Sequence, residues 1–85
     1  MAAEKLTDTI EIYRFKETGI TFSSVCVLVY EGDTVVVKAL RYKIDRSDVR
    51  ELIAHLLARG GVIFCDYERR KKGRRLIKTW RLPCV

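Results

Sequence analysis

Only one stretch of this chain has the spacing of an amphipathic helix. Its apolar side chains recur three and four residues apart and form a continuous stripe: Val49, Leu52, Ile53, Leu56 and Leu57. Either Asp45 or Ser47 can cap the N-terminus of this helix, with Asp48 in the first turn facing the positive end of the helix dipole. The glycines at positions 60 and 61 are typical of a helix C-terminus.

The rest of the chain alternates between apolar and polar positions, as strands do. Strand-like segments cover residues 9–16, 21–30, 34–42, 62–68 and 76–82, and glycine-containing turns follow the first, second and fourth of them. The order is therefore β-β-β-α-β-β. The sequence predicts a single α+β domain over residues 1–85, with a mostly antiparallel sheet and the one helix packed on one face. We expect residues 1–6 to form a flexible N-terminus.

One helix covers one face of a sheet, yet several of these strands are apolar on both faces. In the first strand Ile10 and Ile12 alternate with Tyr13 and Phe15, and residues 25–30 are apolar without interruption. The second face therefore needs a cover, which is either another copy of the chain or a ligand that stacks on aromatic rings. We favour a homodimer, because a domain of this size buries only about 60–65% of its unfolded surface by itself.

The positive charge of the chain is concentrated near its C-terminus. Residues 1–68 carry nine Lys and Arg against eleven Asp and Glu, whereas residues 69–85 carry eight Lys and Arg and no acid. These eight residues lie on and around one predicted hairpin: Arg69, Arg70, Lys71, Lys72, Arg74, Arg75, Lys78 and Arg81. A two-residue or a three-residue loop places like charges opposite one another, which destabilises the hairpin unless a polyanion binds there. The guanidinium group of arginine is well suited to phosphate.

Aromatic residues could add stacking on nucleobases. Tyr13 and Phe15 share one face of the first strand, and for them stacking and burial are equally compatible with the pattern. Tyr67 and Trp80 flank the basic turn. We take Tyr67 as a further stacking candidate and place Trp80 at the edge of the core.

The cysteines do not have the spacing of a metal site. Cys26 and Cys65 each lie in an apolar strand-like segment, and we favour small core residues over a disulfide between them. Cys84 would be free or intermolecular. The chain has no Asn and no Gln, a composition that favours a thermophilic source. The N-terminal residues do not form an apolar signal segment, so we expect a cytoplasmic protein.

The sequence offers little support for an enzyme or for a cofactor. His55 is the single histidine, and its helical position points away from the apolar stripe. Asp66 and Glu68 share one strand face and could hold Mg²⁺ for phosphodiester cleavage, but such carboxylates more often neutralise neighbouring cations.

These patterns together predict a small DNA- or RNA-binding protein that contacts the phosphate backbone through its basic hairpin, largely without reading sequence. They predict no membrane association and no small-molecule substrate. The alternative is a protein-interaction module, such as a small subunit of a ribonucleoprotein assembly.

Overall fold

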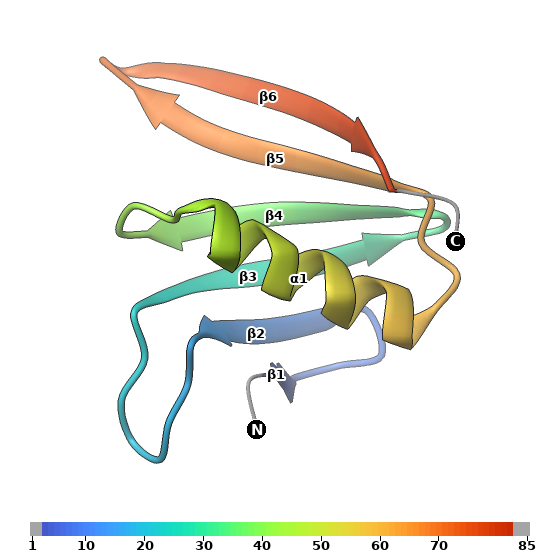
Figure 1. Cartoon of the computed structure of the whole chain (residues 1–85). Helices are drawn as coiled ribbons and strands as arrows, with labels where there is room; N and C mark the ends of the chain where they lie inside the picture. The colour runs from blue at the N-terminus through green and yellow to red at the C-terminus, as the bar shows by residue number, and fades with distance from the viewer. Residues whose placement is uncertain (1–2, 83–85) are drawn as a thin grey trace.

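The computed structural model describes residues 3–82, apart from the side chains of residues 69–71. Its elements are β1 (Ala3–Lys5), β2 (Ile10–Phe15), β3 (Ser24–Glu31), β4 (Thr34–Arg41), α1 (Arg46–Arg59), β5 (Phe64–Lys71) and β6 (Arg74–Arg81). The six strands form one sheet in which the spatial order follows the chain (Figure 1). Only β4 and β5 are parallel to each other. The predicted α+β class is confirmed. One strand, β1, was not expected. It lies within residues 1–6, which were expected to be a flexible N-terminus, and it pairs with β2.

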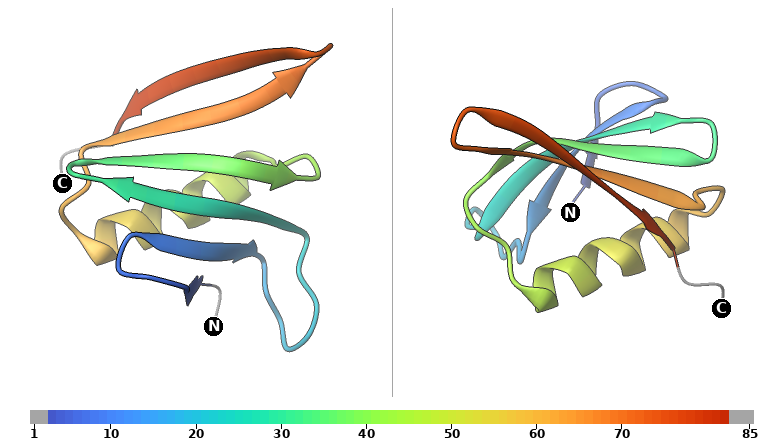
Figure 2. Two further views of the ribbon diagram at one scale, coloured as in Figure 1. Left: turned by 180° about the vertical axis from the view of Figure 1, so that it is seen from behind. Right: turned by 90° about the horizontal axis from the view of Figure 1, so that it is seen from above.

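The helix connects the two parallel strands and crosses one face of the sheet, because parallel neighbours need a crossover connection. Figure 2 shows α1 on one side of the sheet and, within residues 3–82, no element on the other. Of the two N-cap candidates, Asp45 is the cap. The backbone N–H of Asp48 donates to Asp45 Oδ1 at 2.9 Å, and the backbone N–H of Asp45 donates to Asp48 Oδ2 at 3.0 Å. This reciprocal pair is a capping box.

The core lies between α1 and the sheet. Leu52 and Leu56 of the helix are buried against alternating residues of the strands: Tyr13, Phe15, Cys26, Leu28, Tyr30, Val35, Val37 and Cys65. The side chains of Tyr13 and Phe15 are only 2% and 0% exposed, and their rings meet edge to face with centroids 5.0 Å apart. A buried ring cannot stack on a nucleobase. The stacking role considered for these two residues is therefore wrong, and burial is the correct alternative.

The other face of the sheet is apolar along its centre. Its half-buried apolar residues are Ile10, Ile12, Val25, Val27, Val29, Val36 and Phe64. The strand register places Ile10 beside Val29 and Val29 beside Val36, so these side chains form one continuous surface. We call this surface the open apolar face. Nothing within the described chain covers it.

Cys26 and Cys65 are buried free thiols, as expected of small core residues. Burial raises the pKa of the Cys26 thiol to about 12 and that of Cys65 to about 11, so both are protonated and unreactive near neutral pH. Cys84 lies outside the described residues. Within residues 3–82, no helix is long and apolar enough to cross a membrane.

Candidate nucleic-acid interface

The basic hairpin is formed by β5 and β6 and closed by a two-residue turn. The turn residues Lys72 and Gly73 have φ of 51° and 75°, the left-handed conformation that matches the twist of a tight hairpin. Of the two registers considered, the structure has the one that places Arg70 opposite Arg75 and Lys71 opposite Arg74. The backbone register therefore pairs two basic residues at both positions next to the turn.

The outer half of this hairpin leaves the rest of the sheet. β4 pairs with β5 only as far as Tyr67, so the hairpin beyond this point has no neighbouring strand (Figure 1). The cations with described side chains are all exposed: Lys72, Arg74, Arg75, Lys78 and Arg81. The register places Arg74 and Lys78 on the helix side of the hairpin and Arg75 and Arg81 on the opposite side. The side chains of Arg69, Arg70 and Lys71 are outside the description.

One carboxylate reaches into the basic hairpin from β5. Glu68 forms an ion pair with Arg75, in which Nε and Oε1 are 3.1 Å apart and Nη2 and Oε2 are 3.2 Å apart. On the same face, Asp66 Oδ1 accepts a 2.7 Å hydrogen bond from the hydroxyl of Thr79. Glu68 thus neutralises a neighbouring arginine, the commoner of the two roles considered for these carboxylates. Within the described residues, no cluster of three potential metal ligands occurs.

Two aromatic residues lie side by side on the helix side of the hairpin. The rings of Tyr67 and Trp80 are stacked, with centroids 5.7 Å apart and planes 9° apart. Trp80 is half-buried and packs against the core, as expected for a residue at the edge of the core. Of the three stacking candidates, Tyr13, Phe15 and Tyr67, only Tyr67 lies on the hairpin.

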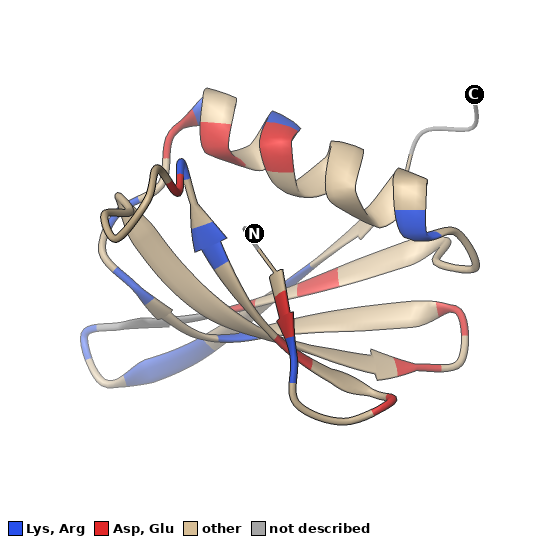
Figure 3. Cartoon of the chain, turned by 90° about the horizontal axis from the view of Figure 1, so that it is seen from below, with Lys and Arg blue, Asp and Glu red and all other residues tan. Residues whose placement is uncertain are grey.

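Charge is unevenly distributed over the molecule. Figure 3 shows Lys and Arg concentrated around the hairpin at one end of the sheet, whereas Asp and Glu lie both at the turns of the opposite end and on the N-terminal half of α1. The last residue of β4, Arg41, the loop residue Lys43 and the first helical residue, Arg46, lie at the hairpin end (Figure 1). These cations share that end with Asp45, Asp48 and Glu51 of the helix N-terminus, so the excess of positive charge lies on the hairpin itself.

A second group of polar residues, which the sequence did not reveal, lies beneath the helix. The hydroxyl of Tyr30 donates to Glu11 Oε1, and His55 Nε2 lies 3.2 Å from the same oxygen. The guanidinium of Arg59 lies over the Tyr30 ring, 3.6 Å from its centroid. Burial alone would raise the pKa of Glu11, but the contacts with Tyr30, His55 and Arg59 outweigh it and hold that pKa below its ordinary value.

A similar contact joins the N-terminal half of α1 to the end of β2. The hydroxyl of Tyr13 donates to Glu51 Oε2 at 2.7 Å, and the backbone N–H of Lys16 donates to Glu51 Oε1 at 3.0 Å. Burial and this carboxylate together raise the pKa of Tyr13 far above its ordinary value. Glu51 and His55 therefore face the sheet, whereas the helical pattern placed His55 away from it. The sequence signal that could have indicated this orientation is Glu11, a polar residue on the same strand face as Tyr13. These contacts anchor α1 to the sheet.

Comparison of the chain with models of protein families, with curated proteins and with solved structures finds no match.

Proposed function

We propose that this protein binds nucleic acid through the β5–β6 hairpin and contacts the phosphate backbone largely without reading sequence. The observation that carries the proposal is the arrangement of the hairpin: exposed cations on both of its sides, like charges directly opposite each other, and no neighbouring strand beyond Tyr67. Repulsion between such pairs destabilises an isolated hairpin by tenths of a kcal/mol each. Bound phosphates would turn that repulsion into affinity.

Fluorescence anisotropy with labelled oligonucleotides tests this proposal. Five or six phosphate contacts on duplex DNA give a slope of about −5 for log K against log salt concentration. Substitution of Arg74 and Arg75 by Ala should weaken binding and reduce the slope by about 2, because each contact contributes about 0.9. Unchanged affinity in the double variant would exclude the hairpin as the binding element.

The open apolar face supports a homodimer as part of the same proposal. An apolar surface of this extent is unusual on a monomer, and two copies could cover it by packing face to face. Val27 lies at the centre of this face, between Ile12 and Lys38 in register. The variant Val27→Lys should sediment as a monomer under conditions in which the wild type sediments as a dimer. A monomeric wild type would rule the dimer out.

The same face supports one other function, that of a subunit in a larger assembly. A partner protein could cover the open apolar face while the hairpin contacts RNA or an acidic surface. In that case the isolated chain would bind generic oligonucleotides poorly and would co-purify with a defined protein. A free-standing binder would hold the oligonucleotides by itself.

A further inference from the structure

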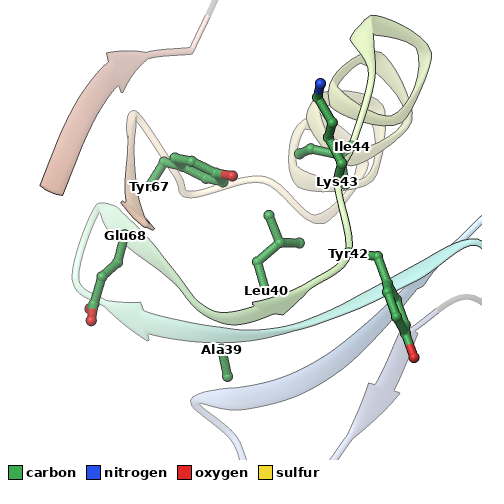
Figure 4. Close-up of a pocket in the computed structure, with 7 residues that line it drawn as sticks. All are labelled: Ala39, Leu40, Tyr42, Lys43, Ile44, Tyr67 and Glu68. Carbon is green, nitrogen blue, oxygen red and sulfur yellow. The ribbon is translucent and has the colours of Figure 1, made fainter. Parts of the chain in front are cut away.

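A cavity of about 460 Å³ lies where β4 and β5 separate, directly beside the basic hairpin. Figure 4 shows the residues that line it: Ala39, Leu40, Tyr42, Lys43, Ile44, Tyr67 and Glu68. Its volume is within the range of sites that hold small organic groups, about 300–1,000 Å³. The proposed phosphate contacts do not use this cavity.

An irregularity in β4 creates the cavity. Val27 pairs with Lys38 but Val25 pairs with Arg41, so β4 contains one residue more than β3 over this stretch. The extra residue is accommodated at Ala39, whose φ is 52°. Such a bulge bends its strand, and the pairing of β4 with β5 ends just before it, at Val37 and Tyr67. The end of β4 then turns towards α1 while β5 continues into the hairpin, and the space between them stays open.

The walls of the cavity combine apolar and aromatic side chains with polar surface. Leu40 and Tyr67 point into the space between the strands, and Ile44 extends towards it from the loop before the helix (Figure 4). Tyr67 is held in place by its stack on Trp80. Glu68 lies on the rim, where it is engaged by Arg75.

Cations flank these walls. Lys78 is directly opposite Tyr67 in the hairpin register and is exposed. Lys43 lines the cavity from the other side and is also exposed. Among the described acidic side chains, none lies within ion-pair distance of Lys43. The site thus combines a partly apolar, aromatic slot with positive charge on both sides.

We propose that this cavity receives an unpaired nucleobase of a single-stranded nucleic acid whose phosphates lie along the hairpin. A base has apolar faces that suit Leu40, Ile44 and Tyr67, and the phosphates on either side of it carry the charge that Lys43 and Lys78 would neutralise. The inference rests on the proposed hairpin function and extends it to a class of ligand. In a duplex the bases are stacked and paired, so they cannot enter the cavity. The protein therefore prefers single strands.

Filling the cavity separates this inference from the hairpin proposal. In the variant Leu40→Trp a larger side chain occupies the slot, and the hairpin cations stay unchanged. Leu57→Trp, at an exposed position of α1, is the matched control. Affinity for a short oligodeoxyuridine, for its oligouridine counterpart and for a mixed-sequence duplex would be measured at two salt concentrations. Circular dichroism would establish that each variant is folded.

We expect Leu40→Trp to lose about five-fold or more of its affinity for at least one single strand, with duplex affinity and salt slope unchanged. The control should match the wild type. Equal single-strand affinity in Leu40→Trp, with weakened binding in the Arg74 and Arg75 double variant, would overturn the nucleobase site and leave the hairpin proposal standing. Loss of affinity in neither variant would overturn both. The DNA and RNA strands show which sugar the site accepts.

Trp80 gives a second measurement that needs no variant. It is the only tryptophan and stacks on Tyr67, so a base entering the cavity should change its fluorescence. Single strands should produce this change at saturation and the duplex should not. The same change with both ligands would contradict insertion of an unpaired base.

Discussion

Replacement of Glu68 by Gln should strengthen nucleic-acid binding, although the substitution removes an ion pair. The carboxylate of Glu68 lies about 3.1 Å from the guanidinium of Arg75. A phosphate oxygen bound on the far side of this guanidinium would be one hydrogen-bond length further away, at about 6 Å from the carboxylate. Two unit charges at about 6 Å in water repel by about 0.7 kcal/mol, which corresponds to about a threefold change in Kd. The lost ion pair is exposed and contributes little to stability.

Anisotropy titrations of a labelled duplex at low salt would measure this effect. Arg74→Ala is the opposite perturbation and should weaken binding while reducing the salt slope by about 0.9. Glu31→Gln removes the same charge at the β3–β4 turn, at the other end of the sheet from the hairpin (Figure 1). At that distance screening leaves little interaction, so the control should bind as the wild type does. Equal strengthening by Glu31→Gln would show that net charge alone controls affinity, and unchanged binding of Glu68→Gln would refute a phosphate contact at Arg75.

Three further predictions concern stability, and urea denaturation measures each of them. Asp45→Ala removes the N-cap of α1 and should lower the free energy of unfolding by about 1 kcal/mol; an unchanged midpoint would contradict the capping role. Because contacts hold the folded pKa of Glu11 below its unfolded value of about 4.3, its stabilising contribution is present above that pH and is lost as pH falls through the folded pKa. The free energy of unfolding should therefore decline below about pH 4.3, and less steeply in Glu11→Gln; identical pH profiles would refute the assignment. Phe15→Ala empties a fully buried position and should cost about 3–5 kcal/mol, enough to unfold much of so small a domain; a small loss would place Phe15 outside the core.

The sequence predicted the elements well, because their patterns are local. The stripe from Val49 to Leu57 and the Asp45 cap depend on neighbours along the chain, and α1 begins and ends where they indicate. The short strand β1 was missed, since three residues carry no detectable alternation. Its pairing with β2 depends on the position of β2 in the sheet.

The choice of the covered face was beyond the sequence. Ile10 and Ile12 on one side of β2 and Tyr13 and Phe15 on the other are comparably apolar, so periodicity cannot say which side receives the helix. The polar contact between Tyr13 and Glu51 distinguishes them, and it joins residues that are 38 positions apart.

For the candidate site, charge composition was sufficient to locate the hairpin, but its details required the strand register. Residues 69–85 contain no acid, yet Glu68 neutralises Arg75 because it lies on the neighbouring strand. The cavity depends on a bulge at Ala39, a residue that rarely adopts a positive φ and therefore gives no signal in the sequence.

Amide chemical shifts of the ¹⁵N-labelled protein, recorded during titration with an unlabelled oligonucleotide at low salt, test the central claim most directly. The account predicts that the largest changes fall on the amides of β5, β6 and the Lys72-Gly73 turn, and that they diminish as salt is added. Changes centred on another surface, or no changes at low salt, would contradict binding through the hairpin.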